Sequence, residues 1–111
     1  MKSGSEAAAK ILELKDRPTA LFCFNDEMAI GAIQKLAGLG LRVPQDISVA
    51  GFDDIPLAHY LDLSTISVDI VGLGMRAIEV LLATMGGEGG PPRTELSTTR
   101  LVLRGTTRPA S

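Results

Sequence analysis

Two adjacent carboxylates, Asp53 and Asp54, follow directly on the apolar run 47–52. Paired carboxylates can bind Mg²⁺, as in receiver-like domains, or serve as acid and base in glycoside hydrolysis. Magnesium chemistry of the receiver type also needs a lysine at a later strand end, and no lysine falls there. Side chains of sequence neighbours on a turn point apart, which disfavours hydrolysis. A magnesium-dependent receiver-like α/β domain stays open as an alternative.

A ligand rich in hydroxyl groups suits the polar residues better. Asn25 follows the apolar run 19–24, just as Asp53 follows its own run. The carboxylate of Asp53 only accepts hydrogen bonds, whereas the amide of Asn25 both donates and accepts them. Each residue also has a purely structural interpretation, since Asn25 can cap a helix and Asp53 can form a turn.

Nucleophilic catalysis finds little support. Cys23 lies inside an apolar run, where a small buried residue is the ordinary interpretation. His59 is the only histidine and stands beside Tyr60 in a predicted loop. No hydrolase or zinc-protease motif is present, so we expect no enzymatic activity, no cofactor and no metal site.

The elements that must position these groups alternate along the chain. We expect buried strands at 19–24, 47–52 and 65–68, two short strands within 94–104, and helices at 3–16, 25–40 and 70–85. Short apolar strands alternating with helices predict an α/β fold, a mainly parallel sheet flanked by helices on both faces. The carboxyl ends of such strands meet at one rim, where ligands bind. Asn25 and Asp53 are both expected there.

The segments between these elements carry turn and linker residues. Residues 53–63 are expected to form a loop, and Ser3 and Glu6 have capping-box spacing at the first helix. The glycine- and proline-rich stretch 86–93 predicts a flexible surface loop, and the polar tail from 105 predicts a loose end.

Composition excludes several classes of protein. The chain has 111 residues, a formal net charge of −2 and 4% aromatic residues, so it is a poor nucleic-acid-binding domain by itself. Its single cysteine suits a reducing compartment. We find no signal peptide and no apolar run of membrane-spanning length, and expect a cytoplasmic protein without a membrane partner.

Several ordered motifs together resemble the LacI/GalR family of bacterial transcription regulators. They cover nearly the whole chain, from about residue 5 to residue 109. The motifs are RPTALFCFNDEMAIGA, GLRVPQDISVAGFDD, LSTISVDIVGLGMRA and LVLRGTT.

The resemblance implies a type I fold similar to periplasmic sugar-binding proteins, in which a small effector, often a sugar, binds between two lobes. Residues 1–111 then correspond to a truncated C-terminal lobe, a partial effector-binding and dimerisation domain without the helix-turn-helix that binds operator DNA. Asn25 and Asp53 match the family's effector contacts, whereas Asp54 is expected to brace its loop. Val68 replaces a glutamine that often contacts the effector. A sugar-binding protein of a transport system shares the fold and is the other alternative.

The resemblance also implies a homodimer surface, for which we select Ile30, Leu57, Tyr60 and Leu61. Ordinary core packing is the alternative for these apolar residues. The helix 70–85 carries an apolar seam that relatives cover with their other lobe. We therefore expect folding back, domain swapping or self-association to cover it. Its members are Val71, Gly74, Ile78, Leu81 and Met85.

Overall fold

The computed structural model describes residues 1–110, in which helices and strands alternate along the chain. In chain order the elements are α1 (Lys2–Ile11), β1 (Ala20–Phe22), α2 (Asp26–Gly38), β2 (Ser48–Ala50), α3 (Pro56–Tyr60), β3 (Thr65–Val68), α4 (Ile70–Met85) and β4 (Thr99–Val102). They belong to two compact units. The large unit contains residues 1–67 and the chain from residue 101, and the small unit contains residues 68–100.

The sheet of the large unit is parallel, as predicted. β1 and β2 pair in register, with Leu21 opposite Val49. The other edge of β2 bonds to chain segments far away in sequence: the Val49 N–H donates to the Thr106 carbonyl and the Gly51 N–H to the Ser64 carbonyl, each at 2.9 Å. Parallel bridges join Ala50 to Ser64 and residue 53 to residue 67. The α/β class and the parallel sheet are thereby confirmed.

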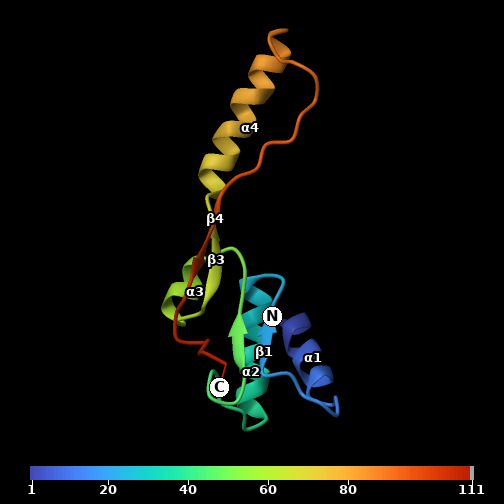
Figure 1. Cartoon of the computed structure of the whole chain (residues 1–111), viewed down its shortest axis with the longest axis vertical. Helices are drawn as coiled ribbons and strands as arrows, with labels where there is room; N and C mark the ends of the chain where they lie inside the picture. Colours follow the sequence, from blue (N-terminus) through green and yellow to red (C-terminus); the bar gives the residue numbers. More distant parts are fainter. Residues whose placement is uncertain (111) are drawn as a thin grey trace. The chain divides into compact units, whose positions relative to one another are not determined.

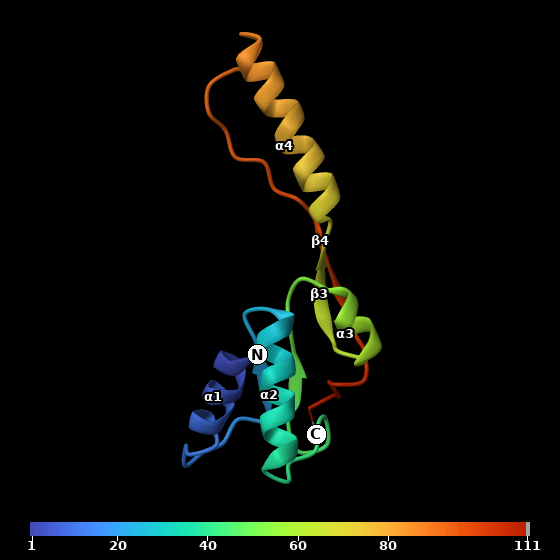
Figure 2. The ribbon, with the colours of Figure 1, turned by 180° about the vertical axis from the view of Figure 1, so that it is seen from behind.

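α2 packs on one face of this sheet, and α1 packs on α2 (Figures 1 and 2). The two helices approach closely because each has a glycine at the contact. A Cβ added to Gly4 would collide with the Met28 backbone, and one added to Gly31 would collide with the Met1 backbone. The buried apolar residues of the core are Ala8, Ala29, Ile30, Ala32, Leu36, Ile47, Val49, Ala58 and Leu63.

β1 is not buried on both faces, contrary to our prediction for 19–24. Leu21 and Cys23 pack against the core, but Phe22 and Phe24 alternate to the other side and remain 69% and 83% exposed. An apolar run cannot distinguish a strand covered twice from a strand covered once. The second face of β1 therefore carries exposed phenyl rings among the described residues.

Three predictions about connections were wrong. Residues 56–60 form a short helix instead of a loop, because Pro56 stands at its first turn, where its missing N–H costs nothing. α1 begins at Lys2 without a side-chain cap from Ser3. Only one strand forms within 94–104.

The tail from residue 105 was expected to be loose, and this was wrong for Thr106 and Arg108, while Ser111 lies outside the described residues. Thr106 is buried, and its hydroxyl donates to the Val49 carbonyl at 2.7 Å. Arg108 donates to the carbonyls of Pro44 and Gln45 at 3.1 and 2.9 Å. These contacts join residues about sixty positions apart in the chain, so local composition contained no sign of them.

The small unit consists of α4 and the segment that returns from it. α4 has the predicted bounds and is capped by Asp69, whose Oδ1 accepts from the Gly72 N–H at 2.9 Å. It has no buried residue, and Val71, Ile78, Leu81 and Met85 of its seam are exposed. Gly74, where we expected close packing, has no neighbour for an added Cβ.

Candidate functional site

The ends of β1 and β2 form an open depression in the large unit. It is lined by Phe22, Phe24, Asn25, Phe52 and Asp53. The chain has three phenylalanines, and all three are in this lining. The depression thus combines the two polar residues singled out from the sequence with aromatic rings that the sequence analysis did not assign to a site.

Asn25 is held rigidly at the start of α2. Its backbone is extended, with φ −151° and ψ 174°, and its Oδ1 accepts a hydrogen bond from the Met28 N–H at 2.9 Å. The helix cap proposed for Asn25 is therefore confirmed. The cap also orients the amide, because the oxygen must face the helix. The side-chain NH₂ group, which has no bond within residues 1–110, can donate to a ligand.

Asp53 has an unusual backbone. Its φ is 113°, a region that residues with a Cβ rarely adopt. Its N–H donates to the Ile66 carbonyl at 3.0 Å, which ties it to β3. The side chain is exposed, and within the described residues its carboxylate accepts no hydrogen bond. Asp53 thus offers a free acceptor at the depression.

Asp54 is a brace, as expected. Its φ is 57°, and its Oδ1 lies 2.9 Å from Nη1 of Arg104 in a largely buried ion pair. The same Arg104 nitrogen donates to the Leu63 carbonyl at 3.0 Å. Of the two neighbouring carboxylates only Asp54 is paired among the described residues, and its partner is a cation, which argues against a shared magnesium ion. Residues 1–110 contain no group of three acids, histidines or cysteines placed to hold a metal.

Asp26 is a residue whose role the sequence analysis missed. It directly follows Asn25 in the sequence and is 0% exposed. Its Oδ1 accepts from the Thr65 hydroxyl at 2.6 Å and its Oδ2 from the Ile55 N–H at 2.9 Å. Gly51 makes room for it, because a Cβ there would meet the carboxylate. No pattern in the sequence pairs these distant residues.

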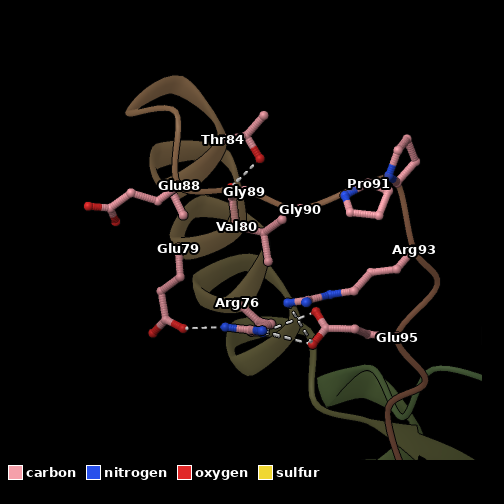
Figure 3. Close-up of a pocket in the computed structure, with 12 residues that line it drawn as sticks. Arg76, Glu79, Val80, Thr84, Glu88, Gly89, Gly90, Pro91, Arg93 and Glu95 are labelled. Carbon is pink, nitrogen blue, oxygen red and sulfur yellow. Dashed lines mark hydrogen bonds and ion pairs between the residues drawn. The ribbon is translucent and has the colours of Figure 1, made fainter.

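The small unit has a polar groove between α4 and residues 88–95 (Figure 3). Arg76 forms ion pairs with Glu95 at 2.8 Å and with Glu79 at 3.2 Å, so the charges of these three side chains are paired with one another. The hydrogen bonds that Arg76 donates to Glu95 and Glu79 raise the pKa of Arg76, and those to Glu95 lower the pKa of the Glu95 carboxyl. This cluster fastens the return segment to α4.

The remaining candidates lie elsewhere. Cys23 is half-buried, and burial raises the pKa of its thiol, as expected of an unreactive cysteine. His59 is exposed and meets Tyr60 edge to face, with ring centres 6.1 Å apart. Of the four dimer candidates, Leu57, Tyr60 and Leu61 are exposed in or directly after α3. Ile30 is only 3% exposed and belongs to the core, so it was wrongly placed on a surface.

The chain is similar to known regulators over most of its length. Residues 1–107 match the periplasmic binding protein-like domain family. The repressor PurR of Vibrio vulnificus is 44% identical over 104 residues, which are 92% of this chain and 31% of PurR. The lac repressor dimer bound to operator and the anti-inducer ONPF superposes with a TM-score of 0.85 at 36% identity, over 94% of this chain and 37% of that one. The chain belongs to the LacI family.

Another LacI family regulator, from Arthrobacter, was solved in complex with lactose. It has a TM-score of 0.82 and 37% identity, over 95% of this chain and 40% of its own. The present chain spans about a third of the length of the curated LacI-type repressors it matches. The match of residues 1–107 to the periplasmic binding protein-like domain family confirms the fold that the sequence motifs implied. Among the described residues, no helix is both long and apolar enough to span a membrane.

Proposed function

We propose that this chain is the effector-binding and dimerisation part of a LacI-type transcription regulator, and that its effector is a carbohydrate. The observation that carries the proposal is the joint placement of Asn25 and Asp53 on one open depression with the phenyl rings. In this proposal the ligand binds between this lobe and a second lobe. Closure then shifts the population that binds operator DNA.

The chemistry of the depression suits a sugar ring. The Asp53 carboxylate accepts from hydroxyl groups, and the Asn25 NH₂ group donates to them. The exposed faces of Phe22 and Phe24 can cover the apolar face of a pyranose, as aromatic linings do in small-molecule sites. The lactose complex of the Arthrobacter regulator supports this class of ligand.

A flat nitrogen heterocycle is the second candidate effector. The lining contains three phenyl rings and only two polar side chains, which favours a ligand with a broad apolar face and few polar groups. Such a ring would stack on a phenyl group and donate an N–H to Asp53. The stacking heterocycle is predicted to depend more strongly on Phe24, which lies two residues after β1 and is 83% exposed.

We also propose that the chain contributes to a homodimer. Leu57, Tyr60 and Leu61 form an exposed apolar group at α3, and the lac repressor is a dimer in its operator complex. Operator binding would belong to another part of the parent regulator, since the net charge of −2 disfavours DNA contact here. Action on DNA implies a cytoplasmic location and no enzymatic role.

A titration of the ¹⁵N-labelled chain tests the proposal. Galactose, glucose, ribose and lactose are added separately at millimolar concentrations, and adenine and cytidine form the heterocycle arm. We expect amide shifts confined to Asn25, Asp53 and their neighbours for at least one carbohydrate. Asp53→Asn should weaken them strongly, because it removes the negative charge and replaces one of the two acceptor oxygens with an NH₂ donor, while it tolerates the same backbone. Asp16→Asn, at an exposed site, is the charge-matched control.

Each other outcome contradicts a defined part of the proposal. A response to a heterocycle alone would mean that the effector is a heterocycle and not a carbohydrate, while the effector-binding role of the chain would be retained. Shifts of undiminished size in Asp53→Asn, or no response in either arm, would overturn the assignment of this depression. A rise in melting temperature with millimolar Mg²⁺ would favour the receiver-like alternative, since binding to the folded state stabilises it.

A further inference from the structure

We propose that Asp26 is a positioning residue that directs the Asp53 carboxylate into the depression. This rests on the proposed function in one respect, namely that Asp53 is the ligand acceptor. Asp26 itself is fully buried and cannot reach a ligand. Its action on the site is through the backbone of the turn that carries Asp53.

The turn needs an external constraint. Asp53 and Asp54 have consecutive positive φ values, 113° and 57°. Conformations of this kind cost energy for any residue with a Cβ, and they persist only where the surroundings determine them. These two φ values send the neighbouring side chains in different directions: the Asp53 side chain lines the depression, while the Asp54 side chain reaches Arg104.

Asp26 holds the turn through both of its carboxylate oxygens. Oδ2 accepts from the N–H of Ile55, two residues after Asp53, at 2.9 Å. Oδ1 accepts from the hydroxyl of Thr65 at 2.6 Å. Thr65 opens β3, and the next residue, Ile66, accepts the Asp53 N–H at 3.0 Å. One buried side chain therefore fixes the exit of the turn and the strand that pairs with it.

The site is shaped to receive this carboxylate. Gly51 leaves the space that Asp26 occupies, and the Asp26 N–H donates to the Phe52 carbonyl at 3.0 Å. Asp26 thus contacts the chain before the turn as well as after it. The Asp54–Arg104 pair constrains the middle of the turn from the other side. Loss of Asp26 would free Ile55, whereas the Arg104 contact would remain.

The test measures the backbone of Asp53 and Asp54 without any ligand. A positive φ gives a strong nuclear Overhauser effect between the amide and Hα protons of the same residue. Asp26→Ala should abolish this signal at Asp53, since Ile55 N–H and Thr65 lose their acceptor. Asp26→Asn should retain it, because the amide oxygen accepts from Ile55 and the NH₂ group can donate to the Thr65 oxygen.

A second pair of variants separates positioning from general destabilisation. Ile47→Ala damages the core away from the turn and should leave the signals of Asp53 and Asp54 intact in the folded fraction. Thr65→Val removes one of the two Asp26 bonds and keeps the side-chain shape, so it should weaken the Asp53 signal partially. If Asp26→Ala does not fold, Thr65→Val alone tests the positioning role.

Persistence of the Asp53 signal in folded Asp26→Ala would overturn the positioning role. If Asp26→Ala does not fold, an undiminished Asp53 signal in Thr65→Val would overturn it. Equal loss of the signal in Ile47→Ala would overturn it too. The carbohydrate titration of the unsubstituted chain is read separately. A turn that changes in Asp26→Ala, combined with no response of the unsubstituted chain to sugars or heterocycles, would retain the positioning role and reject the proposed function.

Discussion

The large and small units each contain a long helix with an apolar face, yet only one of these faces is covered. α2 in the large unit buries Ala29, Ala32 and Leu36 against the sheet. α4 in the small unit has more apolar residues and buries none. An apolar stripe therefore determines which face of a helix can be buried. The residues that bury this face come from other parts of the chain or from another chain.

The local signals of the two helices are nearly equal. Asn25 and Asp69 both accept from the N–H three residues later, each at 2.9 Å. Such caps stabilise a helix end by about 1 kcal/mol and contribute nothing to packing on a core. The contrast between the units must therefore arise from tertiary contacts, and substitutions at equivalent places should expose it.

The largest contrast is expected for leucine truncation. Leu36→Ala in α2, where the side chain is 0% exposed, should lower the free energy of unfolding by about 2 to 5 kcal/mol, since it leaves a cavity. Leu81→Ala in α4, where the side chain is 57% exposed, should change it by less than about 0.5 kcal/mol. Urea unfolding at low protein concentration measures both. Equal losses would mean that α4 has a core of its own.

Glycine substitution should give effects of opposite sign. Gly31→Ala places a Cβ against the Met1 backbone and should cost about 1 to 3 kcal/mol by overpacking the α1–α2 contact. Gly74→Ala meets no atom within 4 Å and should stabilise α4 by up to about 1 kcal/mol through helix propensity. Thermal and urea unfolding report the two changes. A loss at Gly74 would reveal close packing at that position.

Self-association should depend on the small unit. The apolar seam of α4 is exposed, so we expect the chain to form oligomers. Their mass in light scattering should rise with protein concentration. Ile78→Lys introduces a charge on the seam and should weaken association roughly tenfold, about 1.4 kcal/mol. Lys replacing exposed Leu14 of the large unit is the matched control and should have no effect. A monomer at all concentrations would contradict this prediction.

The smallest effects are expected for two exposed ion pairs, Arg42–Asp46 in the large unit and Arg76–Glu95 in the small unit. Hydrogen bonds from Arg42 and Arg76 lower the pKa of Asp46 and Glu95, respectively. A folded-state pKa below the unfolded value means that the pair stabilises the fold above pH of about 4 and ceases to do so as the pH falls through the lowered pKa.

Carboxyl ¹³C titration checks this pH dependence. Arg42→Gln and Arg76→Gln should each return the partner's pKa toward its ordinary value, and added salt should weaken the effect, because both pairs are in contact with solvent. Unchanged titration of Glu95 in Arg76→Gln would show that the return segment is not fastened to α4 in solution.

Much of the fold could be predicted from short-range patterns. The bounds of α4 and β3 and the cap at Asn25 agree with the sequence-based expectation, since each depends on residues within a few positions. Predictions failed at α3, where Pro56 begins a helix, and at the tail, where Thr106 bonds to β2. The exposed side of β1 was also missed. Its hydrophobicity indicates burial, while Phe22 and Phe24 line an open depression.

The candidate site divides in the same way. The sequence alone placed Asn25 and Asp53 at strand ends, because hydrophobic runs and the polar residues after them are local and parallel strands bring their ends to one rim. Only the tertiary structure assigned Asp54 to Arg104 and Asp26 to Ile55 and Thr65. These contacts join residues separated by 29 to 50 positions. Such pairings depend on how the whole chain folds, and no local pattern specifies them.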